Sequence, residues 1–168
     1  MNVVPTGPGC PGYRALVIGI GNLLMSDDGV GVRAIQQLLQ QKLPPGIAAL
    51  VVGTGAIKYL DEISRAETLV AVDAMRGNGL PGTIYRITDL TQLAKIRQKE
   101  IDCHTCDLST IITWARALSG IPTVVILYGL EPFNIAPGCT LSPPVQEALP
   151  RLLSLLLEEI VELCAPGR

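Results

Sequence analysis

Two aspartates and one histidine are the residues of this chain with the clearest capacity for chemistry. Asp28 precedes a helical pattern, Asp73 follows a run of apolar strand residues, and His104 is the only histidine in the sequence. Two carboxylates and one imidazole suit nickel, zinc, iron or manganese, and three protein ligands leave coordination positions open for substrate or water. Such a metal can polarise a peptide carbonyl or activate water, and either carboxylate can act as a general base.

Each of these residues also has a purely structural interpretation. Asp28 could cap a helix or interact with the helix dipole, although its neighbour Asp27 is the better structural candidate. A carboxylate at the end of an apolar strand is costly without a partner, which favours a functional role for Asp73. His104 taken alone could be a surface or helix-start histidine. The metal-site hypothesis therefore depends on the three side chains converging.

The pattern of apolar residues predicts the elements that would bring them together. Apolar runs predict buried strands over residues 13–21, 47–52, 68–72 and 123–128. Helical spacing predicts helices over residues 28–42, around 57–63, over 107–118 and from Ser142 onward. The glycine-rich stretch 74–82 is too short for a helical crossover, so a strand over 83–87 is predicted to be antiparallel, at or near an edge.

Strands that alternate with helices indicate a single α/β domain. We expect three layers: a mostly parallel twisted sheet of about five strands with one antiparallel strand, and helices on both faces. Residues 1–168 would form one domain, with a Pro/Gly-rich N-terminal arm over 1–12 and the α/β domain over 13–164.

Ligands of an open α/β sheet bind beyond the carboxyl ends of its strands. Three segments leave strands at that edge, as does Asp73: residues 21–28, 53–55 and 129–132. Residues 88–103 must then lead the chain back to the same edge before His104. The predicted catalytic and metal-binding residues are therefore Asp28, Asp73 and His104. The predicted substrate contacts are Asn22, Gly53, Thr54, Gly55 and Glu131.

Composition and charge argue against several classes of function. The formal net charge is −2 and the pI is near 5.4, which provides no basic field for nucleic acid. No apolar stretch approaches the roughly 20 residues that a membrane span needs, and the N-terminus lacks the pattern of a secretory signal. An odd number of cysteines, five, fits a reducing compartment. We expect a cytoplasmic protein without nucleic-acid or membrane partners.

The cysteines beside His104 support two weaker interpretations. Cys103 and Cys106 could form half of a zinc site, but a structural zinc site needs two more ligands and only scattered cysteines remain. Cys106 could be a nucleophile at a helix N-terminus, but its thiol needs a histidine placed across from it, and His104 lies two residues away on the same loop. Both remain less favoured than the mixed carboxylate and imidazole site.

Several short motifs are together highly specific in their order and spacing. They are Gly19-Ile20-Gly21-Asn22 followed by Asp27-Asp28-Gly29, then Gly53-Thr54-Gly55, Val72-Asp73-Ala74, Cys103-His104-Thr105-Cys106, Gly129-Leu130-Glu131-Pro132 and Leu141-Ser142-Pro143-Pro144-Val145. In these motifs the chain resembles the nickel–iron hydrogenase maturation endopeptidases. The resemblance covers most of the chain but not the N-terminal arm. Some relatives carry glutamate where this chain has Asp28, which keeps the ligand type and shortens its reach.

The resemblance implies an endopeptidase with a twisted five-stranded sheet between helices. It implies that Asp28, Asp73 and His104 bind nickel, supplied mainly by the substrate, and that the enzyme removes a C-terminal extension from a hydrogenase large-subunit precursor after nickel insertion. Nickel could activate the hydrolytic water or only register the substrate. The alternatives are a non-enzymatic nickel-binding accessory protein for hydrogenase assembly and a nucleotide-binding module. The latter is disfavoured because Leu24 stands where the dinucleotide fingerprint requires glycine.

Overall fold

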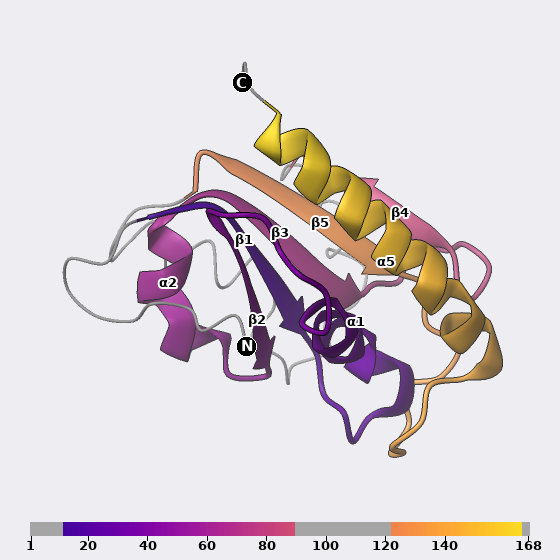
Figure 1. Cartoon of the computed structure of the whole chain (residues 1–168). Helices are drawn as coiled ribbons and strands as arrows, with labels where there is room; N and C mark the ends of the chain where they lie inside the picture. Colours follow the sequence, from indigo (N-terminus) through magenta and orange to yellow (C-terminus); the bar gives the residue numbers. More distant parts are fainter. Residues whose placement is uncertain (1–11, 90–121, 166–168) are drawn as a thin grey trace.

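The structure is a computed structural model that describes residues 12–89 and 122–165, and its centre is a five-stranded sheet (Figure 1). The strands are β1 (Tyr13–Ile20), β2 (Ile47–Gly53), β3 (Ala66–Ala74), β4 (Ile84–Ile87) and β5 (Val124–Leu130). Their order across the sheet is β2-β1-β3-β5-β4, with β4 antiparallel to β5 and the other pairs parallel. The predicted fold class and the antiparallel edge strand are confirmed.

Helices cover both faces of this sheet and complete the three layers. On one face lie α1 (Val30–Leu38) and α5 (Pro143–Cys164), and on the other lies α2 (Leu60–Ser64) (Figure 1). Short 3-10 helices precede α1 and α2: η1 (Ser26–Gly29) and η2 (Ala56–Tyr59). Each face has its own apolar core. Among the described helices, none combines the length and apolar character that a membrane crossing requires.

The first helix differs from its prediction at both ends. A continuous helix over 28–42 was expected, whereas a 3-10 turn contains Asp28 and α1 ends at Leu38. The apolar spacing continues to Leu39, but Leu43 is buried in the core beneath α1 and α5. The chain must leave the helix early to place Leu43 there and enter β2 at Ile47.

Several predicted strand boundaries also differ from the structure, by one or two residues. β3 extends to Ala74 instead of ending at residue 72, and β5 extends to Leu130 instead of residue 128. The two strands pair as Asp73 with Gly129 and Ala74 with Leu130, so the backbone ladder continues beyond the apolar runs. β4 begins at Ile84, one residue later than predicted. The predicted helix over 107–118 lies outside the described residues.

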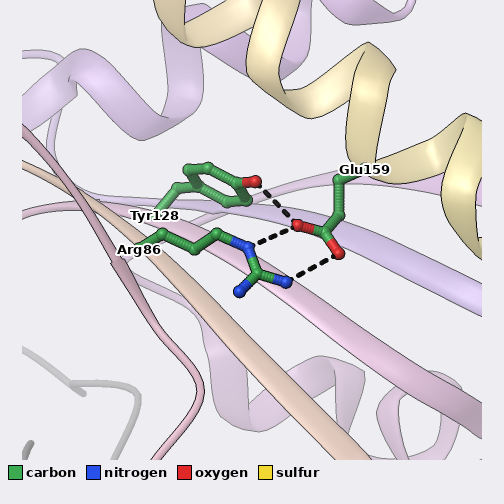
Figure 2. A network of polar contacts seen from close by, with 3 residues as sticks. All are labelled: Arg86, Tyr128 and Glu159. Carbon is green, nitrogen blue, oxygen red and sulfur yellow. Dashed lines mark hydrogen bonds and ion pairs between the residues drawn. The ribbon is translucent and has the colours of Figure 1, made fainter.

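A buried carboxylate joins α5 to the antiparallel edge of the sheet (Figure 2). Glu159, 3% exposed, accepts hydrogen bonds from Arg86 Nε at 2.7 Å, Arg86 Nη2 at 3.0 Å and the Tyr128 hydroxyl at 2.7 Å. Burial, and then the neighbouring Glu159 carboxylate, raise the pKa of Tyr128 to about 12. Sequence reasoning missed this network, although Glu159 stands three residues after Leu156 on the apolar face of the helix.

Candidate functional site

Glycines allow the turn that contains Asp28 to lie directly on the carboxyl ends of two strands. A Cβ on Gly31 would stand 2.3 Å from the carbonyl oxygens of Ile20 in β1 and Val72 in β3. A Cβ on Gly21, whose φ is +121°, would stand 1.8 Å from the Asp28 carbonyl oxygen. Both approaches exclude any larger residue, so the glycine-rich opening motif serves to bring η1 and the start of α1 onto the sheet edge.

The Asp28 carboxylate is half-buried at this edge. Its Oδ2 accepts a 2.7 Å hydrogen bond from the backbone N–H of Asn22, which follows β1 by two residues. Burial raises the pKa of Asp28, and the Asn22 hydrogen bond opposes this shift. A carboxylate whose charge is disfavoured by its surroundings gains from a nearby cation. The predicted contact residue Asn22 thus holds Asp28 in place, and its Oδ1 accepts the N–H of Leu24 at 3.0 Å.

Asp73 reaches the same edge from the neighbouring strand. It is half-buried, is the second-to-last residue of β3 and pairs with Gly129 in β5. β3 also pairs with β1, and Gly19 stands opposite Val72, the residue before Asp73. Neighbouring strands lie about 4.8 Å apart. Asp28, in the 3-10 turn η1 that packs on the ends of β1 and β3, and Asp73, near the end of β3, therefore lie at the same carboxyl edge of the sheet.

The predicted motif Gly53-Thr54-Gly55 adjoins this edge on the other side of β1. The β1–β2 register shifts by one residue, so that Gly19 pairs with Val51 and Ile20 with Gly53. Gly53 has a φ of +59°, and its carbonyl oxygen accepts the N–H of Gly21 at 3.3 Å. This bulge turns the chain at the edge and leaves Thr54 exposed.

Glu131, predicted as a substrate contact, braces the loop that follows Asp73. It is 6% exposed, and its Oε2 accepts the Gly77 N–H at 2.6 Å, the Gly79 N–H at 3.3 Å and the Tyr85 hydroxyl at 2.7 Å. These bonds give Glu131 a structural role that sequence reasoning did not anticipate. Its contact with substrate stays a prediction.

Asp27 braces a second loop and is fully buried. Its Oδ2 accepts the N–H groups of Phe133 at 2.9 Å and Asn134 at 2.8 Å and the Ser142 hydroxyl at 2.7 Å. Its Oδ1 accepts the Ser142 N–H at 2.6 Å. Asp27 thus fastens η1 to the β5–α5 loop and to the residue before α5, which confirms its structural interpretation.

The described part of the site supplies oxygen ligands for a metal but not a full ligand set. His104, Cys103 and Cys106 lie outside the described residues. Within residues 12–89 and 122–165, no three His, Cys, Asp or Glu side chains are grouped so that they could hold a metal ion. Two carboxylates at one edge of the sheet suit a borderline divalent ion that also has ligands from elsewhere, and they can accept a proton from water.

Comparison with known proteins gives a consistent family. A family model described as "Hydrogenase maturation protease" matches residues 32–159. The hydrogenase 2 maturation protease of Escherichia coli is 29% identical over 155 residues, which cover 89% of this chain and 94% of that protein. The hydrogenase expression/formation protein HupD of Thiocapsa roseopersicina is 30% identical over 149 residues, which cover 88% of this chain and 67% of that protein.

Solved structures agree with these relatives. The hydrogenase maturating endopeptidase HybD from E. coli superposes with a TM-score of 0.79 at 27% identity, over 89% of this chain and 93% of that chain. A hydrogenase 2 maturation peptidase from a Thaumarchaeota archaeon gives a TM-score of 0.68 at 29% identity, over 88% and 98% of the two chains. The family model spans most of the sheet and its helices, and the chain belongs to the hydrogenase maturation proteases, a family of endopeptidases.

Proposed function

We propose that this protein removes the C-terminal extension of a nickel–iron hydrogenase large-subunit precursor after nickel has been inserted. The nickel belongs to the precursor, and Asp28, Asp73 and His104 complete its coordination when the precursor docks. The single observation that carries the proposal is the position of Asp28, in the turn η1, and Asp73, near the end of β3, at the carboxyl edge of the sheet in a chain of this endopeptidase family.

The chemistry of the two carboxylates supports a site that the substrate completes. Two oxygen ligands and one imidazole leave coordination positions that a precursor's own nickel ligands can fill. Docking would then register the scissile peptide beside the carboxyl edge of the sheet. A precursor without nickel would not be positioned in this way and would not be cleaved. Cleavage would therefore occur only after metal insertion is complete.

The proposed hydrolysis needs a base and a proton donor, which a carboxylate can supply in turn. Asp28 or Asp73 accepts a proton as water attacks the scissile carbonyl carbon. When the carbon–nitrogen bond breaks, the same carboxyl group returns a proton to the leaving amine. The products are the mature large subunit with a new C-terminal carboxylate and the free peptide.

The direct test uses the purified protein with nickel-loaded and nickel-free precursor, and mass spectrometry to detect loss of the C-terminal peptide. We expect cleavage of the nickel-loaded form only. Equal cleavage of both forms, or of neither, would refute nickel-gated processing. Metal-dependent complex formation without a trimmed product would identify the protein as a non-enzymatic accessory protein.

Substitutions test two of the three proposed ligands, Asp73 and His104. Asp73→Asn and His104→Ala should each abolish processing and leave the thermal transition nearly unchanged. Asp61→Asn is the matched control, because the Asp61 side chain is 71% exposed on α2 and pairs with Arg65. Processing by the Asp61 variant should equal that of the native protein. Full processing by either ligand variant would contradict the assignment of that residue.

A further inference from the structure

Large apolar side chains are exposed mainly around the carboxyl edge of the sheet. Among residues 12–89 and 122–165, seven such side chains are exposed, and four of them lie on segments that follow a strand at this edge: Leu24, Ile57, Leu80 and Phe133. Exposed apolar residues that are scattered over a surface need no explanation, but a concentration beside a candidate site indicates an interaction. Leu24 and Phe133 are the two that adjoin the Asp28 turn.

The segments that carry Leu24 and Phe133 are hydrogen-bonded to each other. Gly138 donates its N–H to the Leu24 carbonyl at 2.9 Å and accepts the Ser26 N–H at 2.8 Å. Asp27 donates its N–H to the Asn134 carbonyl at 3.0 Å. The loop after β1 and the loop after β5 therefore form one joined rim beside Asp28, and they lie side by side in Figure 1.

This rim holds its two apolar side chains outward. Leu24 is 65% exposed and Phe133 is 66% exposed. The backbone N–H of Phe133 is fixed by the buried Asp27 carboxylate, and the N–H of Leu24 is fixed by the Asn22 side chain. Because both backbones are fastened, the segment that carries each side chain cannot fold toward the core without breaking a hydrogen bond. A surface preorganised in this way loses little entropy when it binds a partner.

We propose that Leu24 and Phe133 are specificity-determining residues, which together contact an apolar side chain of the precursor next to the bond that is cleaved. The proposal rests on the proposed function. An endopeptidase must hold a polypeptide across its site, and this rim borders the turn that contains Asp28. The backbone of the precursor offers no apolar group to Leu24 and Phe133. These two side chains therefore select a precursor with an apolar residue near the cleavage point.

The test compares steady-state processing of the nickel-loaded precursor by the native protein and three variants. Phe133→Ser should raise KM about ten-fold, the size of effect expected when most of an apolar contact is lost, and leave kcat nearly unchanged. Phe133→Leu should restore most of the native KM because the contact needs an apolar side chain rather than an aromatic ring. All variants should retain the native thermal transition and nickel dependence.

The matched control is Val161→Ser. Val161 is also 66% exposed, but it lies near the C-terminal end of α5, at the opposite edge of the sheet. There Arg14, at the start of β1, donates a hydrogen bond to the Cys164 carbonyl. This variant should process the precursor normally. An unchanged KM in Phe133→Ser, or equal losses in Phe133→Ser and Val161→Ser, would overturn the proposal.

A second measurement separates this proposal from the proposed function. The affinity of each variant for the nickel-loaded precursor is measured by calorimetry, with Asp73→Asn introduced to prevent turnover. Weaker binding by the additional Phe133→Ser change would support the apolar contact even if the native protein cleaved nothing. Unchanged binding with normal nickel-gated cleavage would overturn the contact and leave the proposed function standing.

Discussion

Replacing Asp27 and Asp28 separately by asparagine should separate folding from function at neighbouring positions. An asparagine at position 27 keeps the side-chain shape but has one oxygen where the carboxylate has two. If that oxygen faces Phe133 and Asn134, the new NH2 group faces the Ser142 N–H, which loses its acceptor. The remaining hydrogen bonds also lose the contribution of the negative charge.

The size of this effect follows from the number of bonds. A buried donor without an acceptor costs about 1–3 kcal/mol, and a hydrogen bond to a neutral group is weaker than one to a charged group by about 1 kcal/mol. With Asp27 fully buried, Asp27→Asn should lower the free energy of unfolding by about 3 kcal/mol. For a domain of this size, the thermal midpoint should fall by roughly 6–12 °C.

Asp28→Asn should change stability little and should remove activity. The asparagine oxygen can still accept the Asn22 N–H, and burial of a neutral amide avoids the desolvation that raises the pKa of Asp28. We therefore expect a change of less than about 1 kcal/mol in the free energy of unfolding, together with loss of precursor processing.

The assay is equilibrium urea unfolding at pH 7 for both variants, alongside processing of the nickel-loaded precursor. Native stability of Asp27→Asn, or destabilisation of Asp28→Asn as strong as that of Asp27→Asn, would contradict the structural role assigned to Asp27. A second substitution, Ser142→Ala, removes only one of the hydrogen bonds to Asp27, so its cost should be smaller, about 1 kcal/mol.

Two further predictions concern packing and pH. Gly31→Ala should destabilise the protein by about 3 kcal/mol in urea unfolding, because its Cβ would meet two backbone oxygens. Gly55→Ala, whose Cβ would have no neighbour closer than 3.7 Å, should change stability little; similar costs at both positions would contradict the close approach at Gly31 as the cause. Tyr128 has a folded pKa of about 12, above its ordinary value of 10, so its neutral hydroxyl contributes stability that is fully present below pH 10 and is lost as the pH rises through 12. The difference in unfolding free energy between the native protein and Tyr128→Phe should therefore narrow between pH 10 and 12, and a constant difference would exclude this pKa.

Local patterns in the sequence were sufficient to predict the layers of the fold and the edge that carries the site. Apolar runs separated by helical spacing were sufficient for a parallel sheet, and the short glycine-rich stretch before β4 required an antiparallel strand. Because ligands bind where parallel strands end, the same pattern placed Asp28 and Asp73 at one edge. Local periodicity and connection length carry this information without knowledge of any long-range contact.

The different roles of the neighbouring residues Asp27 and Asp28 depend on long-range contacts of the fold. Asp27 and Asp28 have the same side chain, and the sequence could only favour one of them as structural. The loop that makes Asp27 a buried acceptor lies more than 100 residues further along the chain, at Phe133, Asn134 and Ser142. The partners of Glu131 and Glu159 are likewise distant in sequence. A buried charge is defined by the donors that the fold brings to it, and no local pattern specifies those donors.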